Sequence, residues 1–322
     1  KASAAYKKFS SFTNEGKKDF NYGTIMIPVS KQDISSAEVF KIVKETQEKF
    51  NVPLYSTTTG FSVKGVDLGS NNFRKVQDPK VAMLIGDGVS SYEAGEVWHL
   101  LDTRIHMPLT KIMMRNFRRA SLDKYNTLVM VSGSYSQLDS VQKGKLKSWI
   151  SDGNTLITIA RASEWAVRNK IIKEKLTTEP KSKDKTNEVK RLPYVEASEH
   201  LGRERLGGAI FEVDLDITHP LGFGYRDSNL PVYKNNTVFL APSKSPYATV
   251  AKYSKNPHID GFISNKNLET FLKPSASIIV SPVGRGRVIL FADNPNFRGA
   301  WYGTNKLFLN ALFFGNRISV PR

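Results

Sequence analysis

The pattern of apolar and polar positions between residues 80 and 160 alternates short apolar runs with amphipathic stretches. The apolar runs predict buried strands at 81–85, 108–112, 128–131 and 155–159. Helical spacing and capping signals predict helices that begin after Gly88, over 137–151 and over 163–173. Strands that alternate with helices indicate an α/β fold, a three-layer sandwich whose mostly parallel sheet is covered on both faces.

The flanking regions have different patterns. Residues 1–20 are polar and small and predict a mobile or peripheral lead-in. A strand at 24–29, a capping box at Ser35 with a helix whose apolar face includes Phe40 and Phe50, and a strand at 53–57 predict a βαβ unit. We therefore predict four parts: a lead-in with a βαβ subdomain at 1–78, an αβ core at 79–176, an exposed polar loop at 177–205, and a β-rich addition at 206–322 that returns to the core with a final strand and helix.

The amino-acid composition excludes several kinds of functional site. The chain has 322 residues and no cysteine, which excludes disulfides, thiolate metal sites and cysteine nucleophiles. No apolar run approaches the roughly 20 residues that span a bilayer. The net charge of +17 would suit a polyanion, but most basic residues are interleaved with acids and no nucleic-acid motif accompanies them. The start at Lys1 favours a processed product or a piece of a longer protein.

A ligand site in such a sheet lies at the carboxyl ends of the strands. The turn after residue 85 could bind an anion at a helix start, although a tight turn is the simpler interpretation. Ser163 stands where an α/β hydrolase would carry its nucleophile, but the Gly-x-Ser-x-Gly frame is missing and a helix cap is favoured. The predicted crevice consists of Asp87, Ser91, Ser132, Arg161, Ser163 and Glu164.

Two further groups of residues are candidates. Glu96 and His99 are three apart on a helix and could face one metal ion, but no third ligand is evident and a solvated helix face is favoured. A loop near the C-terminus concentrates aromatic and cationic side chains of the kind that bind sugars or peptides, although its arginine could equally fix its own loop. This candidate binding loop consists of Phe297, Arg298, Trp301 and Tyr302.

Four strings resemble the C-terminal region of the large secreted zinc carboxypeptidases of Bacteroidetes-type bacteria. They are YGTIMIPV from residue 22, GVDLGSNNF from residue 65, PKVAMLIGDGVSSYEAGEVWHLLDTR from residue 79, and GRVILFADNPNFRGAWYGTNKLFLNALFFG from residue 286. The last string is also similar to a wider set of bacterial glutamine-amidotransferase-like domains. The resemblance implies a class I glutamine amidotransferase-like core, of the flavodoxin-like or Rossmann-like kind, that follows a peptidase domain.

The chain departs from both families where their chemistry would be. The zinc motif His-x-x-Glu is absent, so zinc is expected only in an upstream peptidase domain. The best match to the amidotransferase nucleophile motif places Ala160 where the cysteine would stand, and alanine cannot attack a substrate. The His-Pro-Glu motif has only a weak counterpart at His219, where leucine replaces the acid that would orient the imidazole.

The favoured hypothesis is a non-catalytic accessory domain of a secreted or periplasmic zinc carboxypeptidase. It would support the upstream peptidase domain or bind a peptide, a glycan or another partner, without a cofactor, a membrane span or nucleic acid. One alternative is a hydrolase or amidotransferase-like enzyme that uses Ser163 or a site at Glu96 and His99. A third hypothesis is a polyanion-binding module.

Overall fold

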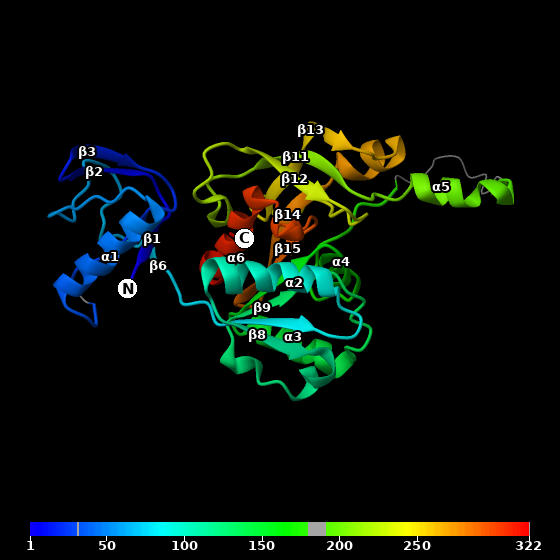
Figure 1. Ribbon diagram of the computed structural model, residues 1–322, viewed down its shortest axis with the longest axis horizontal. Helices are drawn as coiled ribbons and strands as arrows, with labels where there is room; N and C mark the ends of the chain where they lie inside the picture. The colour runs from blue at the N-terminus through cyan, green and yellow to red at the C-terminus, as the bar shows by residue number, and fades with distance from the viewer. Residues whose placement is uncertain (31, 180–190, 322) are drawn as a thin grey trace. The chain divides into compact units, whose positions relative to one another are not determined.

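The computed structural model describes residues 1–30, 32–179 and 191–321 (Figure 1). The chain divides into two compact units, Lys1–Asp78 and Pro79–Arg322. Each unit has its own sheets and its own buried side chains.

The first unit contains two small antiparallel sheets and one helix. Stacked and edge-on rings join its parts: the Phe9 ring lies 4.8 Å from Phe20 and 5.2 Å from Phe73. One sheet has the order β4 (Ile25–Met26), β1 (Ser3–Ala5) and β6 (Phe73–Lys75); the other has the order β3 (Gly16–Phe20), β2 (Phe9–Thr13) and β5 (Lys64–Gly65). The helix is α1 (Ser36–Phe50).

Three predictions for this unit are corrected. Residues 1–20 contribute strands rather than a mobile lead-in, because the Phe9 side chain supplies an apolar anchor within a polar stretch. No strand forms at 53–57, so the predicted βαβ unit is absent. The capping box at Ser35 is present, but α1 buries only Val39, whereas Phe40 is 66% exposed.

The second unit is built on a nine-stranded sheet. Five adjacent strands, β8, β7, β9, β10 and β15, pair in parallel, and within the sheet only β14 and β11 run against the other strands. The sheet order is β12 (Asn229–Lys234), β11 (Ala209–Leu215), β13 (Thr249–Gly261), β14 (Ala276–Val283), β15 (Gly286–Phe291), β10 (Thr155–Ile159), β9 (Thr127–Met130), β7 (Val81–Ile85) and β8 (Leu109–Met113).

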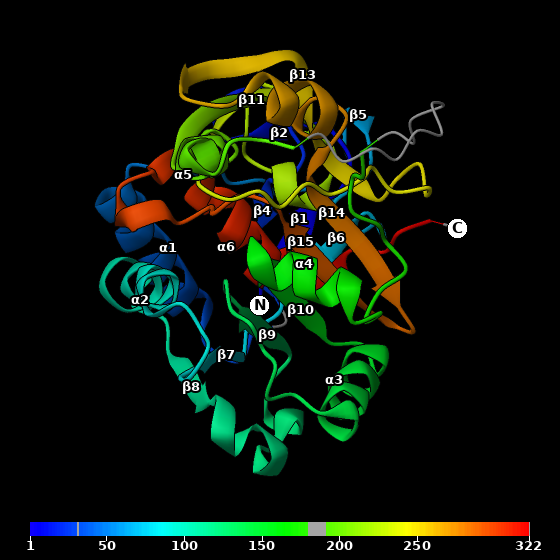
Figure 2. The same cartoon turned by 90° about the vertical axis from the view of Figure 1, so that its right-hand side faces the viewer.

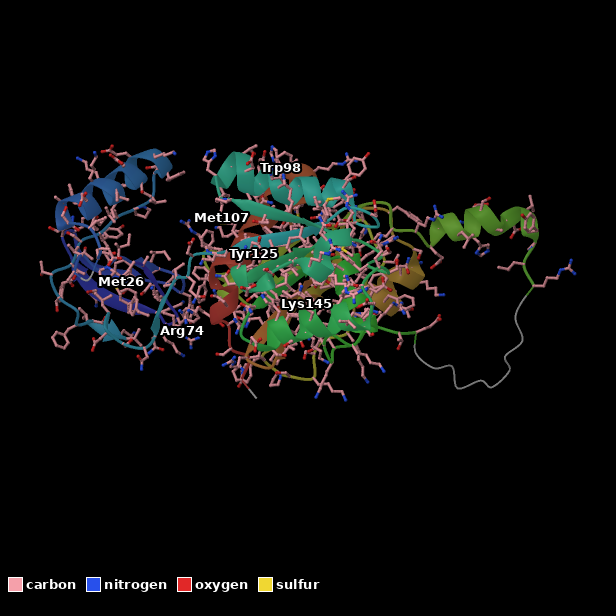
Figure 3. All side chains as sticks on the ribbon, turned by 90° about the horizontal axis from the view of Figure 1, so that it is seen from below. Met26, Arg74, Trp98, Met107, Tyr125 and Lys145 are labelled. Carbon is pink, nitrogen blue, oxygen red and sulfur yellow. The ribbon has the colours of Figure 1, made fainter. Side chains whose placement is uncertain are left out.

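Helices cover both faces of this sheet. Side chains of α2 (Ser91–His99) and α6 (Asn305–Phe314) belong to one hydrophobic core, and side chains of α3 (Ser140–Ser151) and α4 (Arg161–Arg168) belong to the other. Figure 2 shows the ribbons of these four helices around the strands of the sheet. Figure 3, which labels Trp98 on α2 and Lys145 on α3, shows these two helices on opposite sides of the sheet. This arrangement confirms the predicted α/β three-layer sandwich.

Short helical segments complete the unit. The π-helical turn η1 (Leu100–Ile105) extends α2, and α5 (Ala197–Arg203) has no buried residue. The others are η2 (Met114–Arg119), η3 (Leu122–Lys124), η4 (Tyr194–Glu196), η5 (Pro220–Gly222), η6 (Asn267–Leu272), η7 (Phe297–Gly299), η8 (Tyr302–Thr304) and η9 (Gly315–Arg317).

Several element boundaries differ from the sequence predictions. Helix α3 starts at Ser140, not at residue 137, because the Asp139 side chain accepts the Gln142 N–H in a capping box. Val141 of this helix is 65% exposed. Within the predicted β-rich addition, β12 is a six-residue strand and β13 is one long strand with bulges in its pairing with β11. Residues 180–190 of the predicted exposed loop at 177–205 lie outside the described residues, and the described part of this loop contains η4 and α5. No helix in the described part of the chain is long and apolar enough to cross a membrane.

Candidate functional site

An open polar cleft of about 890 Å³ lies beyond the carboxyl ends of β7, β9 and β10. Parallel strands present their carboxyl ends along one edge of a sheet, so loops distant in sequence meet there. The cleft is lined by Gly88, Val89, Ser90, Glu93, Ser132, Gly133, Ser134, Arg161, Glu164, Trp165, Arg168, Asn169, Asn235 and Asn236.

One rim of the cleft is made by the loops after β7 and β9. The Ser134 N–H donates to the Gly88 carbonyl at 2.9 Å, and the Ser90 N–H donates to the Ser132 carbonyl at 2.8 Å. Gly88 has φ +81°, and a Cβ there would lie 2.7 Å from Ser134 Oγ. A Cβ at Gly133 would lie 2.8 Å from the Gly88 carbonyl oxygen. Both glycines are therefore required for the close approach of the two loops.

Glu93 enters the cleft wall from the first turn of α2. Ser90 caps this helix because its side chain accepts the Glu93 N–H. The second bond of a capping box, from the Ser90 N–H to the Glu93 carboxylate, is not formed. Its Oε2 atom accepts the Ser132 N–H at 2.8 Å instead. Burial raises the pKa of the Glu93 carboxyl above its ordinary value of 4.5, against the lowering effect of the Ser132 hydrogen bonds.

The turn between β10 and α4 has the backbone of a nucleophile elbow. Ala160 adopts φ +50° and ψ −115°, a conformation that is strained for any residue with a side chain. A sharp, strained strand-to-helix turn is the feature that displays the nucleophile in elbow enzymes. Here the turn carries a methyl group, and Ala160 is fully buried in the hydrophobic core beneath α2 and α6. The elbow therefore offers neither a nucleophile nor access to one.

Ser163 lies inside α4 and not at its cap, which corrects the sequence interpretation, because α4 begins at Arg161. The side chain is fully buried. Its Oγ atom lies 2.9 Å from both Thr158 Oγ1 and the Phe291 carbonyl oxygen. The hydroxyl thus joins α4 to strands β10 and β15, and it is not a lining group of the cleft.

Charges within the cleft are balanced. The Arg168 guanidinium pairs with the Glu164 carboxylate at 2.7 Å on α4. The Arg161 N–H donates to Ser132 Oγ at 3.3 Å, while the Arg161 side chain is exposed. Its positive charge opposes the rise in the pKa of Glu93. Two arginines and two glutamates therefore line the same polar space.

A buried ion pair fixes the opposite wall. Lys234, at the end of β12, is fully buried, and its Nζ atom lies 3.2 Å from Asp293 Oδ1 and donates to Asn236 Oδ1. Asp293 also accepts bonds from the hydroxyls of Tyr253 and Ser277. Burial lowers the pKa of Lys234, whereas the Asp293 charge opposes this change. The network holds the turn at Asn236, which lines the cleft.

Glu96 holds the predicted aromatic loop, one helical turn beyond Glu93. Its two oxygens accept the Asn294 side-chain amide at 2.6 Å and the Arg298 N–H at 2.7 Å. Burial raises the pKa of Glu96, and these two bonds oppose the rise. Arg298 has φ +51°, a conformation that costs of order 1–3 kcal/mol and requires such support.

The aromatic rings of this loop pack against strand β12. The Phe297 ring is stacked on the Tyr233 ring with centroids 3.6 Å apart, and Trp301 lies 6.5 Å from Tyr233. Trp301 Nε1 donates to the Pro231 carbonyl at 3.4 Å. The Tyr302 ring is 59% exposed. The predicted loop residues are therefore brought together, and the sequence did not identify Tyr233 as their partner.

The remaining predicted residues lie elsewhere. Asp87 and Ser91 are exposed and do not line the cleft. His99 faces the same loop as Glu96, since a Cβ at Gly299 would lie 3.2 Å from its Nδ1 atom. Within the described ranges, no three His, Cys, Asp or Glu side chains cluster in a way that could hold a metal ion.

His219, the weak counterpart of an amidotransferase histidine, is a structural residue. Its Nδ1 atom accepts the Leu221 N–H, which caps the short helix η5. Burial lowers the pKa of His219 to about 4, so the imidazole is neutral at pH 7.

Comparison with known proteins gives matches in structure alone. No family model matches the chain, and no curated protein matches it. Similar solved structures include a ThuA-like protein from Parabacteroides merdae (TM-score 0.48, 12% identity, 76% of this chain and 92% of that one) and PurLQS from Thermotoga maritima (TM-score 0.47, 11% identity, 73% and 98%). A protein from Thermoplasma acidophilum that is described as a GMP synthase subunit has a TM-score of 0.45 and 11% identity over 73% of this chain and 94% of that one. None of these three proteins is named as a carboxypeptidase.

Proposed function

We propose that the chain is a non-catalytic, amidotransferase-like module that binds a ligand in the polar cleft. The observation that carries this proposal is the elbow, where Ala160 has the strained backbone of a nucleophile position but a buried methyl group. Ser163 is engaged in structural hydrogen bonds, so no hydroxyl replaces the missing sulfur at this turn. A polar cleft nevertheless remains beside the elbow, and polar groups that converge in a concave site favour a binding role.

The wider biological role in this proposal comes from the sequence resemblance. The module would accompany the zinc peptidase domain of a secreted or periplasmic protein, and zinc would belong to that domain. Its contribution would be to hold substrate, a glycan or a partner near the peptidase. The coding sequence upstream of Lys1 tests this role directly, because it should encode a His-x-x-Glu peptidase segment.

Catalysis and binding are tested separately on the purified chain. We expect no release of product above the blank from glutamine, from simple amides and esters, or from peptides incubated with zinc. Turnover that persists in the purified chain and disappears in Ser163→Ala or Glu93→Gln would overturn the proposal. A thermal-shift screen should find ligands, since one present at 100 times its Kd stabilises the folded state by about 2.7 kcal/mol. Stabilisation should be lost in Arg161→Met, which changes only an exposed cleft side chain.

A further inference from the structure

Four aromatic side chains form a shelf beside the cleft, which we call the aromatic shelf. Tyr233 and Phe297 are stacked, Trp301 is tilted against Tyr233, and Tyr302, which follows Trp301 in the chain, is the most exposed member. One side of the Tyr302 ring is taken by the Arg104 guanidinium, 4.2 Å from the ring centroid. An aromatic ring held in this way presents a flat apolar face at the surface.

The shelf and the cleft share two walls. On α2, Glu93 lines the cleft, and Glu96 one turn later accepts the Arg298 N–H of the shelf loop. On the other side, Tyr233 belongs to the shelf and Asn235, two residues on, lines the cleft. A ligand with several linked units would therefore contact both the cleft and the shelf.

The shelf is held in place before any ligand arrives. Glu96 fixes the loop at two points, and Thr304 Oγ1 donates to the Pro295 carbonyl at 2.7 Å. The positive φ of Arg298 is retained by these contacts. A preorganised surface reduces the entropy cost of binding, and residues with strained backbones cluster at ligand sites.

The chemistry of the two surfaces fits a neutral sugar chain. Asn235 and Arg161 each carry a planar polar group that can hydrogen-bond two neighbouring hydroxyls, and Glu93, whose Oε2 accepts the Ser132 N–H, has a second oxygen that can accept one more. The balance of arginine and glutamate in the cleft gives no net attraction for an anionic or cationic polymer. An aromatic face packs against the C–H face of a pyranose ring, which is the apolar side of a sugar.

Other polymers fit less well. Among the cleft-lining residues only Val89 and Trp165 are large and apolar, which leaves no pockets for peptide side chains. A peptide cannot extend the sheet smoothly at β12, because Pro231 lacks an N–H and its carbonyl accepts a bond from Trp301. Nucleic acids require a positive groove, which the paired charges of the cleft do not provide.

We infer that the module binds a neutral oligosaccharide that runs from the cleft across the aromatic shelf. This inference rests on the proposed function and names the class of ligand for the same site. The sugar hydroxyls are bound by the cleft, and a sugar ring further along the same oligosaccharide stacks on the exposed face of Tyr302. The Lys234 network and Glu96 position these groups without contacting the ligand.

Affinity electrophoresis of the purified chain tests the inference. Native gels contain one neutral polysaccharide each: a mixed-linkage β-glucan, xyloglucan, galactomannan or starch. We expect at least one of them to retard the wild-type chain, and Tyr302→Ala and Asn235→Ala each to weaken that retardation at least tenfold in apparent Kd. Tyr247→Ala is the matched control, because Tyr247 is 60% exposed but belongs to neither surface, and it should bind like the wild type. Circular dichroism establishes that each variant is folded.

The outcomes separate the two proposals. Binding only to polygalacturonate or to a pool of peptides, sensitive to Arg161→Met but not to Tyr302→Ala, would overturn the sugar inference and leave the binding function intact. Retardation by neutral gels that is unchanged in Tyr302→Ala and Asn235→Ala would also overturn it, because the sugar would then bind elsewhere. Failure to bind any neutral gel, peptide pool or thermal-shift ligand would overturn both proposals.

Discussion

Replacing Lys234 by methionine perturbs the buried network that fixes one wall of the cleft. The Lys234 ammonium is fully buried and donates to Asn236 Oδ1, to the Val238 and Ala292 carbonyls, and to Asp293. Methionine has a similar length and no charge, so it fills the space but leaves the Asp293 carboxylate without its counter-ion. Removal of one partner from a buried ion pair costs about 3–5 kcal/mol. Because Asp293 keeps two hydroxyl donors, we expect a loss near the lower end, about 3 kcal/mol.

The double variant separates charge from packing. In Lys234→Met with Asp293→Asn, no uncompensated charge remains, and replacement of a whole buried pair is often close to neutral. We therefore expect the double variant to be more stable than the sum of the two single losses predicts, by about 2 kcal/mol of coupling. At a loss of about 3 kcal/mol, the melting temperature of Lys234→Met alone should fall by roughly 6–12 °C for a unit of this size.

Tryptophan fluorescence during urea unfolding is a suitable assay. All four tryptophans of the chain lie in Pro79–Arg322, so their emission reports this unit and not the first one. A loss below about 1 kcal/mol in Lys234→Met, or single losses that simply add in the double variant, would refute the assignment of a charged, coupled pair.

Three further perturbations have defined outcomes. Burial raises the folded-state pKa of Glu93 above its ordinary value of 4.5, so its contribution to stability is present below that value and is lost as the pH rises through the folded pKa. Glu93→Gln should therefore reduce the fall in unfolding free energy between pH 4 and pH 7, measured by urea unfolding. An unchanged pH dependence in this variant would show that burial of Glu93 does not cause the fall. Glu96→Ala should weaken sugar binding in affinity gels more than Glu96→Gln does. Alanine removes both acceptors, for the Asn294 amide and the Arg298 N–H, whereas glutamine keeps one oxygen. Equal effects of the two variants would contradict the positioning role of Glu96. Ser163→Ala should cost about 1–3 kcal/mol of stability, because the Thr158 and Phe291 carbonyls lose a buried hydroxyl donor. The variant should still bind the ligand. Normal stability together with lost binding would refute the structural role of Ser163.

The central elements could be predicted from the sequence because their signals are local. The apolar runs at 81–85 and 155–159 are buried strands with those bounds, and the helix predicted after Gly88 buries Val97, Leu100 and Leu101, which recur at helical spacing along α2 and η1. Strand-end topology also predicted where a crevice would lie. These features depend on the period of hydrophobic residues and on turn chemistry, both of which can be read from one short stretch.

Other features depend on contacts between distant segments and give little local signal. Asn235 follows β12, which pairs at the edge of the sheet opposite β8, and a proline such as Pro231 gives a weak sequence signal for a strand because it is confined to edge strands. Glu93 has the spacing of a capping box, yet its carboxylate bonds to Ser132, 39 residues away. A cap was the natural interpretation of Ser163, but the strained turn at Ala160 starts the helix earlier.

Thiol labelling at the elbow tests the central claim, that the turn keeps a nucleophile's backbone but is closed. The chain has no cysteine, so Ala160→Cys introduces a single thiol, and Arg161→Cys is the matched control at an exposed cleft position. Because Ala160 is fully buried, we predict that the native Ala160→Cys thiol reacts at least about 100-fold more slowly than the Arg161→Cys thiol, and that it hydrolyses neither glutamine nor esters. Labelling as fast as the control would show an open elbow and would contradict the claim that the turn is closed; turnover by the Ala160→Cys thiol would contradict it further.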